Sequence, residues 1–286
     1  MTLDRADPKN ADQIAYWNGT GGQSWVKRQE SQEAALEPVS AALLARAAVE
    51  TGERIVDIGC GTGVTTVELA RLAGPTGEVL GIDVSEPMLA RAGARPVAGL
   101  PLRFARADAT THAFPRARFD LLFSRFGVMF FADPAKSFAN LRTALRPGGR
   151  LAFACWRRPD ENPWLTIPLR AALEHAPPPP QPGPDEPGMF SFAAETRVRR
   201  LLEAAGFADI RLEPADFQFD IARGQGLEEA AAAAISVGPA SRVLGGQPPA
   251  VVEAAATAIR RALEPHQRGA AVPLAAAIWV VTAHNG

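Results

Sequence analysis

Hydrophobic and polar positions follow two alternating periodicities over residues 38–156. Short apolar runs of strand length recur at 54–58, 78–83, 102–106, 119–123 and 150–155. Stretches with helical spacing separate most of them, at 38–51, 64–72, from Ser85 onward and at 133–147. Regular alternation of strands and helices is typical of a parallel sheet covered by helices on both faces.

The pattern changes after residue 156. Residues 159–187 hold 10 of the 25 prolines, and the run Pro177–Pro180 excludes a helix or a central strand there. A helix is predicted over 196–205, a strand over 207–213, alanine-rich helices over 227–264 and a last apolar strand over 274–283. We expect an N-terminal lid arm (1–37), a core (38–156, 193–219 and 273–286) and two cap insertions, one proline-rich (157–192) and one mainly helical (220–272).

A glycine-rich turn follows the first strand, in the segment Val56-Asp57-Ile58-Gly59-Cys60-Gly61-Thr62-Gly63. Glycine lets the backbone approach a ligand closely, and the helix that follows presents free N–H groups and the positive end of its dipole. A dinucleotide-binding GxGxxG fingerprint would place its last glycine at position 64, which is valine here. The turn therefore predicts a nucleotide-like ligand, and Val64 argues against a nicotinamide dinucleotide without excluding it.

Three acidic residues stand at the ends of three strands: Asp57, Asp83 and Asp108. The carboxyl ends of parallel strands lie at one edge of the sheet, where open α/β sheets bind ligands. Asp83 closes the second strand and is placed to accept hydrogen bonds from a ribose diol. We therefore expect the three carboxylates to meet at one ligand site.

These segments together resemble the class I S-adenosylmethionine-dependent methyltransferases, in particular the ubiquinone/menaquinone C-methyltransferase-like branch that acts on small molecules. The resemblance rests on Asp57–Gly63, Gly81-Ile82-Asp83, Ala107-Asp108-Ala109, Phe119-Asp120 and Leu145-Arg146-Pro147-Gly148-Gly149. It implies an α/β, Rossmann-like fold with a seven-stranded, mainly parallel sheet, whose last strand is antiparallel, plus the inserted cap.

The resemblance also implies a cofactor, S-adenosylmethionine, which leaves as S-adenosylhomocysteine, and a set of residues that bind it. Asp57 would lie beside the methionine part, Asp83 would bind the ribose hydroxyls and Asp108 the adenine amino group. The full set expected to bind the cofactor is Tyr16, Trp25, Asp57, Gly59, Cys60, Gly61, Thr62, Gly63, Asp83, Val84, Met88, Asp108, Ala109 and Arg125.

Methyl transfer is an in-line displacement, so the protein mainly aligns the donor and the acceptor and excludes water. His112 and Arg125 are the candidate catalytic residues, although alignment alone can suffice. The expected acceptor is a small apolar or aromatic molecule, methylated on oxygen or carbon. The residues expected to form its pocket are Tyr16, Trp17, Phe126, Met129, Trp156, Trp164 and Phe190.

Composition narrows the classes further. Thirty Lys and Arg against 31 Asp and Glu argue against a nucleic-acid partner, and two cysteines cannot make a four-ligand zinc site. We therefore expect no bound metal. No apolar run reaches membrane-spanning length and the first residues are polar, so we also expect no membrane span and a cytoplasmic protein. Oligomeric state stays open, with a homodimer as one option.

Two other functions stay open at this point. One is an NAD(P)-dependent oxidoreductase with a related sheet, although the chain lacks a Tyr-x-x-x-Lys pair because Thr20 follows Tyr16 by four residues. The other is a catalytically silent protein that binds the cofactor without turning it over.

Overall fold

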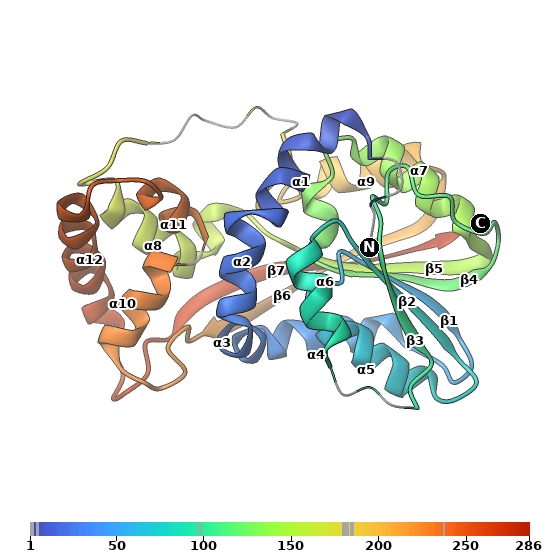
Figure 1. Cartoon of the computed structure of the whole chain (residues 1–286), viewed down its shortest axis with the longest axis horizontal. Helices are drawn as coiled ribbons and strands as arrows, with labels where there is room; N and C mark the ends of the chain where they lie inside the picture. Colours follow the sequence, from blue (N-terminus) through green and yellow to red (C-terminus); the bar gives the residue numbers. More distant parts are fainter. Residues whose placement is uncertain are drawn as a thin grey trace.

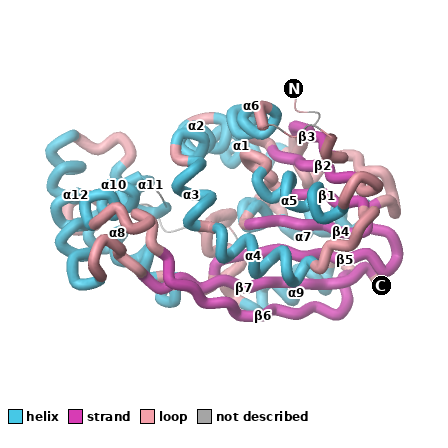
Figure 2. Tube along the Cα trace, turned by 90° about the horizontal axis from the view of Figure 1, so that it is seen from below, coloured by secondary structure: helices cyan, strands magenta, loops and turns pink. Residues whose placement is uncertain are grey.

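A computed structural model describes residues 3, 6–95, 97, 99–178, 183, 186–236 and 238–286. Its centre is a seven-stranded sheet in the order β3-β2-β1-β4-β5-β7-β6, with the strands side by side in Figure 2. The strands are β1 (Arg54–Ile58), β2 (Glu78–Asp83), β3 (Leu102–Arg106), β4 (Phe119–Arg125), β5 (Leu145–Trp156), β6 (Phe207–Phe219) and β7 (Leu274–Asn285).

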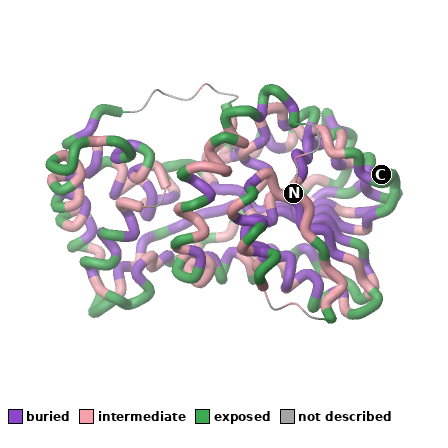
Figure 3. Tube along the Cα trace, viewed as in Figure 1, coloured by how far each residue is buried: buried purple, intermediate pink, exposed green. Residues whose placement is uncertain are grey.

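The first five strands are parallel, and β7 runs antiparallel to both β5 and β6. This confirms the predicted mainly parallel sheet with an antiparallel last strand. The central strands are rich in Val, Ile, Leu and Phe, and Figure 3 shows them buried, because helices cover both faces of the sheet.

Helices α4 and α5 lie on one side of the sheet and α7 and α9 on the other (Figure 1). Pro87, in the first turn of α6, and the side chain of Ser85, which accepts from the Met88 amide, mark its start as the sequence predicts. The core helices are α4 (Glu37–Ala47), α5 (Val64–Ala73), α6 (Glu86–Gly93), α7 (Pro134–Ala144) and α9 (Glu195–Ala204).

The two segments predicted as cap insertions come together in one helical cluster, at the left of Figure 1. Helix α8 packs against α11 and α12, and α10 packs against α11 and α12. The long strands β6 and β7 connect this cluster to the core. Its helices are α8 (Pro163–Ala172), α10 (Leu227–Ser236), α11 (Gly238–Leu244) and α12 (Pro249–Leu263). Pro179 and Pro180 of the predicted proline run lie outside the described residues.

The N-terminal arm is helical and lies between the core and this cluster in Figure 1. It consists of η1 (Pro8–Asn10), α1 (Ala11–Asn18), α2 (Thr20–Lys27) and α3 (Gln29–Ala35). Helix α2 packs on α6, while Arg28 donates to Ser236 of α10 at 2.5 Å. The arm therefore contacts both parts of the molecule.

Strands β4 and β7 extend two residues past their predicted ends, and β5 and β6 are longer than predicted by several residues. Strand β6 continues past Glu213 through Pro214 to Phe219, which is possible because β6 is an edge strand and Pro214 needs no ladder hydrogen bond on its open side. Strand β5 starts at Leu145, so the Pro147-Gly148-Gly149 segment belongs to the strand, with an irregular register against β4. In the described part of the chain, no helix has the length and apolar character needed to cross a membrane.

Candidate active site

The glycine-rich turn after β1 forms one wall of a cavity at the carboxyl edge of the sheet. Gly59, Gly61 and Gly63 all have positive φ, at 65°, 55° and 78°, a region that side-chain-bearing residues rarely adopt. A Cβ at Gly61 would lie 2.7 Å from Cε of Met88, another residue that lines the cavity. The turn therefore presents bare backbone to the cavity.

Asp57 lies fully buried behind this wall. Its Oδ2 accepts hydrogen bonds from the hydroxyls of Thr65 and Thr66 at 2.8 and 2.7 Å, in the first turn of α5. Its Oδ1 is buried and has no hydrogen-bond partner among the described residues. Burial raises the pKa of Asp57 to about 6, and the two hydroxyl hydrogen bonds only partly offset it.

Asp83, at the end of β2, lines the cavity and joins two loops. Its Oδ2 accepts from the Gly61 amide and its Oδ1 from the Ser85 amide, both at 2.8 Å. Burial raises the pKa of this carboxyl, while the backbone hydrogen bonds lower it. Because a carboxylate offers about four acceptor positions, each oxygen of Asp83 retains capacity for a further donor.

Asp108, after β3, also lines the cavity, and the N-terminal arm covers it. The Asn10 amide nitrogen donates to Oδ1 at 2.9 Å and to Oδ2 at 2.8 Å, and the backbone amides of Asp7 and Thr110 each donate one bond more at 2.9 Å. Only 2% of Asp108 is exposed. These bonds attach the arm to the ligand edge of the sheet.

Arg125, at the end of β4, forms a shielded ion pair inside the cavity wall. Its Nη2 lies 2.8 Å from Oε1 and 2.7 Å from Oε2 of Glu33 on α3, and its Nη1 donates to Ser40 at 2.8 Å. The two charged side chains are only 9% and 12% exposed. Glu33 therefore neutralises the guanidinium.

Aromatic side chains line the cavity between the arm and β4. Trp17 meets Phe130 edge-on, with ring centroids 5.1 Å apart, and Trp25 lines the same cavity. Phe126 has φ of 68°, an unusual backbone conformation for a bulky residue, and its ring stacks on Trp156 at 4.3 Å. Strain of this kind clusters at functional sites.

The cavity gathers most of the residues that the sequence predicted for the site. Those lining it are Trp17, Trp25, Gly59, Cys60, Gly61, Thr62, Asp83, Val84, Met88, Asp108, Ala109, Arg125 and Phe126. The other predicted residues do not line it; they are Tyr16, Asp57, Gly63, His112, Met129, Trp156, Trp164 and Phe190.

Several of these outlying residues have clear alternative surroundings. Tyr16 lies under the Arg242 guanidinium, 4.7 Å from the ring centroid, and the His112 ring meets Phe114 edge-on. Trp156 and Trp164 are buried and continue the aromatic stack behind Phe126, with centroids 5.1 Å apart. These indoles fill the core, so they do not line the cavity with Trp17 and Phe126.

Sequence reasoning predicted Trp17 but missed the three other residues that the start of the arm and α1 place on the cavity, Asn10, Gln13 and Ile14. Asn10, Gln13, Ile14 and Trp17 all line the cavity, at the i, i+3, i+4, i+7 spacing of one helix face. That spacing was the signal that could have identified them. Glu33 was missed because its role depends on an ion pair with a residue 92 positions later.

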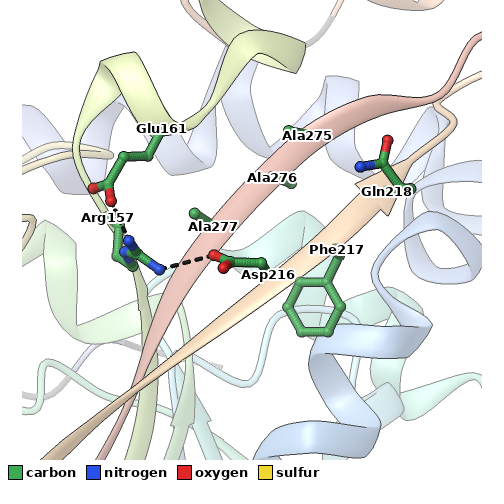
Figure 4. Close-up of a pocket in the computed structure, with 8 residues that line it drawn as sticks. All are labelled: Arg157, Glu161, Asp216, Phe217, Gln218, Ala275, Ala276 and Ala277. Atoms are coloured by element: carbon green, nitrogen blue, oxygen red, sulfur yellow. Dashed lines mark hydrogen bonds and ion pairs between the residues drawn. The ribbon is translucent and has the colours of Figure 1, made fainter.

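A second recess lies on β6, β7 and the loop after β5, among Arg157, Asp216, Gln218 and Ala275–Ala277 (Figure 4). Arg157 is paired there with both Glu161 and Asp216, and its guanidinium lies 5.0 Å from the Trp279 ring centroid. The two carboxylates neutralise the Arg157 guanidinium, so this recess is a weaker candidate for a ligand site than the cavity.

Comparison with known proteins agrees with this geometry. A methyltransferase domain family matches residues 55–149. Nocamycin O-methyltransferase from Saccharothrix syringae is 31% identical over 61% of this chain and 66% of its own length. Demethylmenaquinone methyltransferase from Thermus thermophilus is 43% identical over 35% of this chain and 45% of its own length. The chain spans between about a third and two thirds of the length of the curated relatives it matches.

Solved structures share the fold at low sequence identity. The YcgJ protein from Bacillus subtilis superposes with a TM-score of 0.56 at 15% identity, covering 88% of this chain and 98% of that one. The [4+2]-cyclase SpnF superposes with a TM-score of 0.50 at 18% identity, covering 86% of this chain and 79% of that one. These structures show the fold alone, whereas the strand order and the matched domain identify residues 55–149 as a class I S-adenosylmethionine-dependent methyltransferase domain.

Proposed function

We propose that this protein transfers a methyl group from S-adenosylmethionine to the oxygen or carbon of a small, neutral, apolar or aromatic acceptor. When bound, the cofactor supplies a methyl group on a positively charged sulfur. The protein's own contribution is to bind the cofactor, orient the acceptor and exclude water.

The polar groups of the cavity fit this cofactor. Gln13 and Thr62 line the cavity, and their Oε1 and Oγ1 atoms are buried without a partner among the described residues; Oδ1 of Asp57 is likewise unpartnered, behind the turn. All three can accept hydrogen bonds, and the cofactor carries matching donors on its ammonium, ribose and adenine groups. Asp83, with capacity on both oxygens, would hold the ribose diol.

The charges that line the cavity also favour a cationic cofactor. Among the described residues, the carboxylates of Glu33, Asp83 and Asp108 face a single guanidinium, that of Arg125. Because opposite charges attract strongly in a shielded site, this excess of negative charge favours a sulfonium over its neutral product. It also disfavours an anionic acceptor, since Glu33 already neutralises Arg125.

The observation that carries the acceptor class is the aromatic wall of Trp17, Trp25, Phe126 and Phe130. Apolar walls with few polar groups are typical of sites for small apolar ligands. In the part of the chain that the structure describes, no histidine lines the cavity, and its carboxylates are engaged with the arm, the loops or Arg125. A neutral phenol or enol would release its proton to solvent as the methyl group is transferred, so the proposal assigns no general base to the protein.

The experiment measures S-adenosylhomocysteine formation with matched panels of neutral aromatic and polyanionic acceptors. We expect turnover only with the first panel. Trp17→Ala should raise KM for the acceptor at least tenfold, whereas Tyr16→Ala, whose ring lies under Arg242, should change it less than twofold. Turnover with the anionic panel alone would reject the acceptor class.

A second candidate, a cofactor-binding protein without methyl transfer, is favoured by one observation. The cyclase SpnF has the same fold, so the fold does not fix the reaction. Calorimetric binding of S-adenosylhomocysteine without product formation from any acceptor in either panel would support this second function.

A further inference from the structure

Phe126 is held in an unusual backbone conformation at the wall of the cavity. Its φ of 68° lies in the left-handed region, so the contacts around this bulky residue have to offset the strain. Its amide donates to the Ala154 carbonyl at 3.1 Å, and its ring lies within 10° of parallel to the Trp156 ring. Phe126 lines the cavity and keeps 8% of its surface exposed. The stacked indole therefore fixes an aromatic residue at a wall that a ligand would meet.

The Trp156 indole is itself supported from behind by other rings. The Trp164 ring, in the first turn of α8, lies 5.1 Å from it between centroids, and the Phe219 ring lies 4.5 Å from that of Trp164. The Trp164 Nε1 donates to Asn162 at 3.2 Å, and Asn162 is fully buried and exchanges hydrogen bonds with the β7 backbone at 2.9 and 3.1 Å. These contacts leave the indole behind Phe126 little room to move.

The turn after Phe126 is fixed by bonds that do not involve the Trp156 side chain. The Trp156 backbone amide donates to Sδ of Met129 at 3.5 Å. The Met129 carbonyl accepts from the Gly188 amide at 3.1 Å and from the Ser191 hydroxyl at 2.7 Å. A variant that shortens the Trp156 side chain therefore keeps these bonds and removes the ring stack.

Because Trp156 covers one face of the Phe126 ring, the surface left for a ligand is the other face or the edge. Offset-stacked and edge-to-face arrangements both attract a second aromatic ring beyond simple burial, whereas a saturated ring gains burial alone. We propose that Phe126 selects planar aromatic acceptors over saturated ones of the same size, and that Trp156 is the positioning residue that holds the Phe126 ring. This inference rests on the proposed function, and it narrows the acceptor from apolar to aromatic.

The experiment measures ligand binding by isothermal titration calorimetry on the full chain saturated with S-adenosylhomocysteine. The ligands are two matched pairs of neutral alcohols, phenol with cyclohexanol and 2-naphthol with decahydro-2-naphthol. We expect the wild type to bind the aromatic member of at least one pair about fivefold more tightly or better. Phe126→Leu keeps an apolar side chain without the ring, so it should reduce this preference to less than twofold. Its affinity for S-adenosylhomocysteine should change less than threefold.

Two variants of Trp156, which does not line the cavity, test the positioning role. Trp156→Leu removes the stack and should also reduce the preference to less than twofold, whereas Trp156→Phe keeps an aromatic face and should retain at least threefold. Phe192→Leu is the matched control, because Phe192 is only 1% exposed and its ring packs on Phe138 with centroids 6.0 Å apart, outside the cavity lining. This control should lose stability and keep the preference.

Equal binding of the aromatic and saturated alcohols by the wild type, or binding of neither, would overturn the inference. A preference that survives Phe126→Leu, or one that Phe192→Leu also abolishes, would do the same. If the preference is lost in Phe126→Leu but kept in Trp156→Leu, the positioning role of Trp156 is wrong. Failure of the wild type to bind S-adenosylhomocysteine at all would instead reject the proposed function.

Discussion

Gly59 and Gly127 meet backbone to backbone. A Cβ built on Gly59 would lie 2.7 Å from the Gly127 Cα, and one on Gly127 would lie 2.6 Å from the Ile58 carbonyl oxygen. The turn after β1 is thereby held against the turn after β4, which carries Phe126. The first glycine of the motif thus has a packing role inside the protein in addition to any ligand contact.

Gly59→Ala should therefore destabilise the protein by at least about 2 kcal/mol, since it combines a positive φ with a backbone clash. Urea unfolding at neutral pH measures the loss. Gly246→Ala is the control, because Gly246 has φ of 76° but no described atom lies within 4 Å of the position that its Cβ would take, so it should cost only about 1 kcal/mol. Equal losses in the two variants would contradict the packing role.

Asp57 should make stability depend on pH in an unusual direction. Burial raises its pKa from 3.8 to about 6, so the folded protein holds this proton more tightly than the unfolded chain. The contribution to stability is fully present below pH 3.8 and is lost as the pH rises through about 6. Asp57→Asn, which cannot ionise, should gain about 1 kcal/mol relative to wild type between pH 5 and pH 8.

Urea unfolding at pH 5, 6, 7 and 8 checks this prediction. Asp120→Asn is the control. Although burial opposes it, hydrogen bonds from Arg146 and the Arg54 amide lower the pKa of Asp120, so this carboxylate is ionised throughout that range. Its variant should differ from wild type by a constant amount. A flat difference for Asp57→Asn as well would show that Asp57 titrates normally.

Asp83→Ala should weaken binding of S-adenosylhomocysteine by more than tenfold. The carboxylate is expected to hold the ribose and also fixes the amides of Gly61 and Ser85. Calorimetry gives the affinity, and circular dichroism checks that the variant stays folded. Asp120→Ala, near the opposite end of the strands, should leave the affinity unchanged; an unaltered affinity in Asp83→Ala would remove this residue from the site.

Arg125→Met should destabilise the protein by about 3 kcal/mol or more, because it leaves the shielded Glu33 carboxylate without its partner. The double variant Arg125→Met/Glu33→Gln should recover at least half of that loss in urea unfolding. The exposed pair of Lys9 with Asp133 gives the comparison, and Lys9→Met should cost less than about 1 kcal/mol. If the double variant recovers nothing, Glu33 is not the group that Arg125 neutralises.

Patterns along the chain are sufficient to predict the sheet and its ligand edge. Alternating strands and helices require a parallel sheet, and the carboxyl ends of parallel strands share one edge. Asp83 and Asp108 therefore had to approach the glycine-rich turn whatever the rest of the chain does. These are consequences of local periodicity and of topology, and both can be predicted from residues near each other in sequence.

The partners that complete the site depend instead on how distant segments pack in three dimensions. Asn10 reaches Asp108 across 98 positions and Glu33 reaches Arg125 across 92, and no local pattern specifies such pairs. Trp156 and Trp164 are of a residue type that often lines ligand pockets, but they pack into the core behind Phe126. An aromatic side chain gains the same burial energy against protein as against a ligand, so only the packing around it determines which of the two it meets.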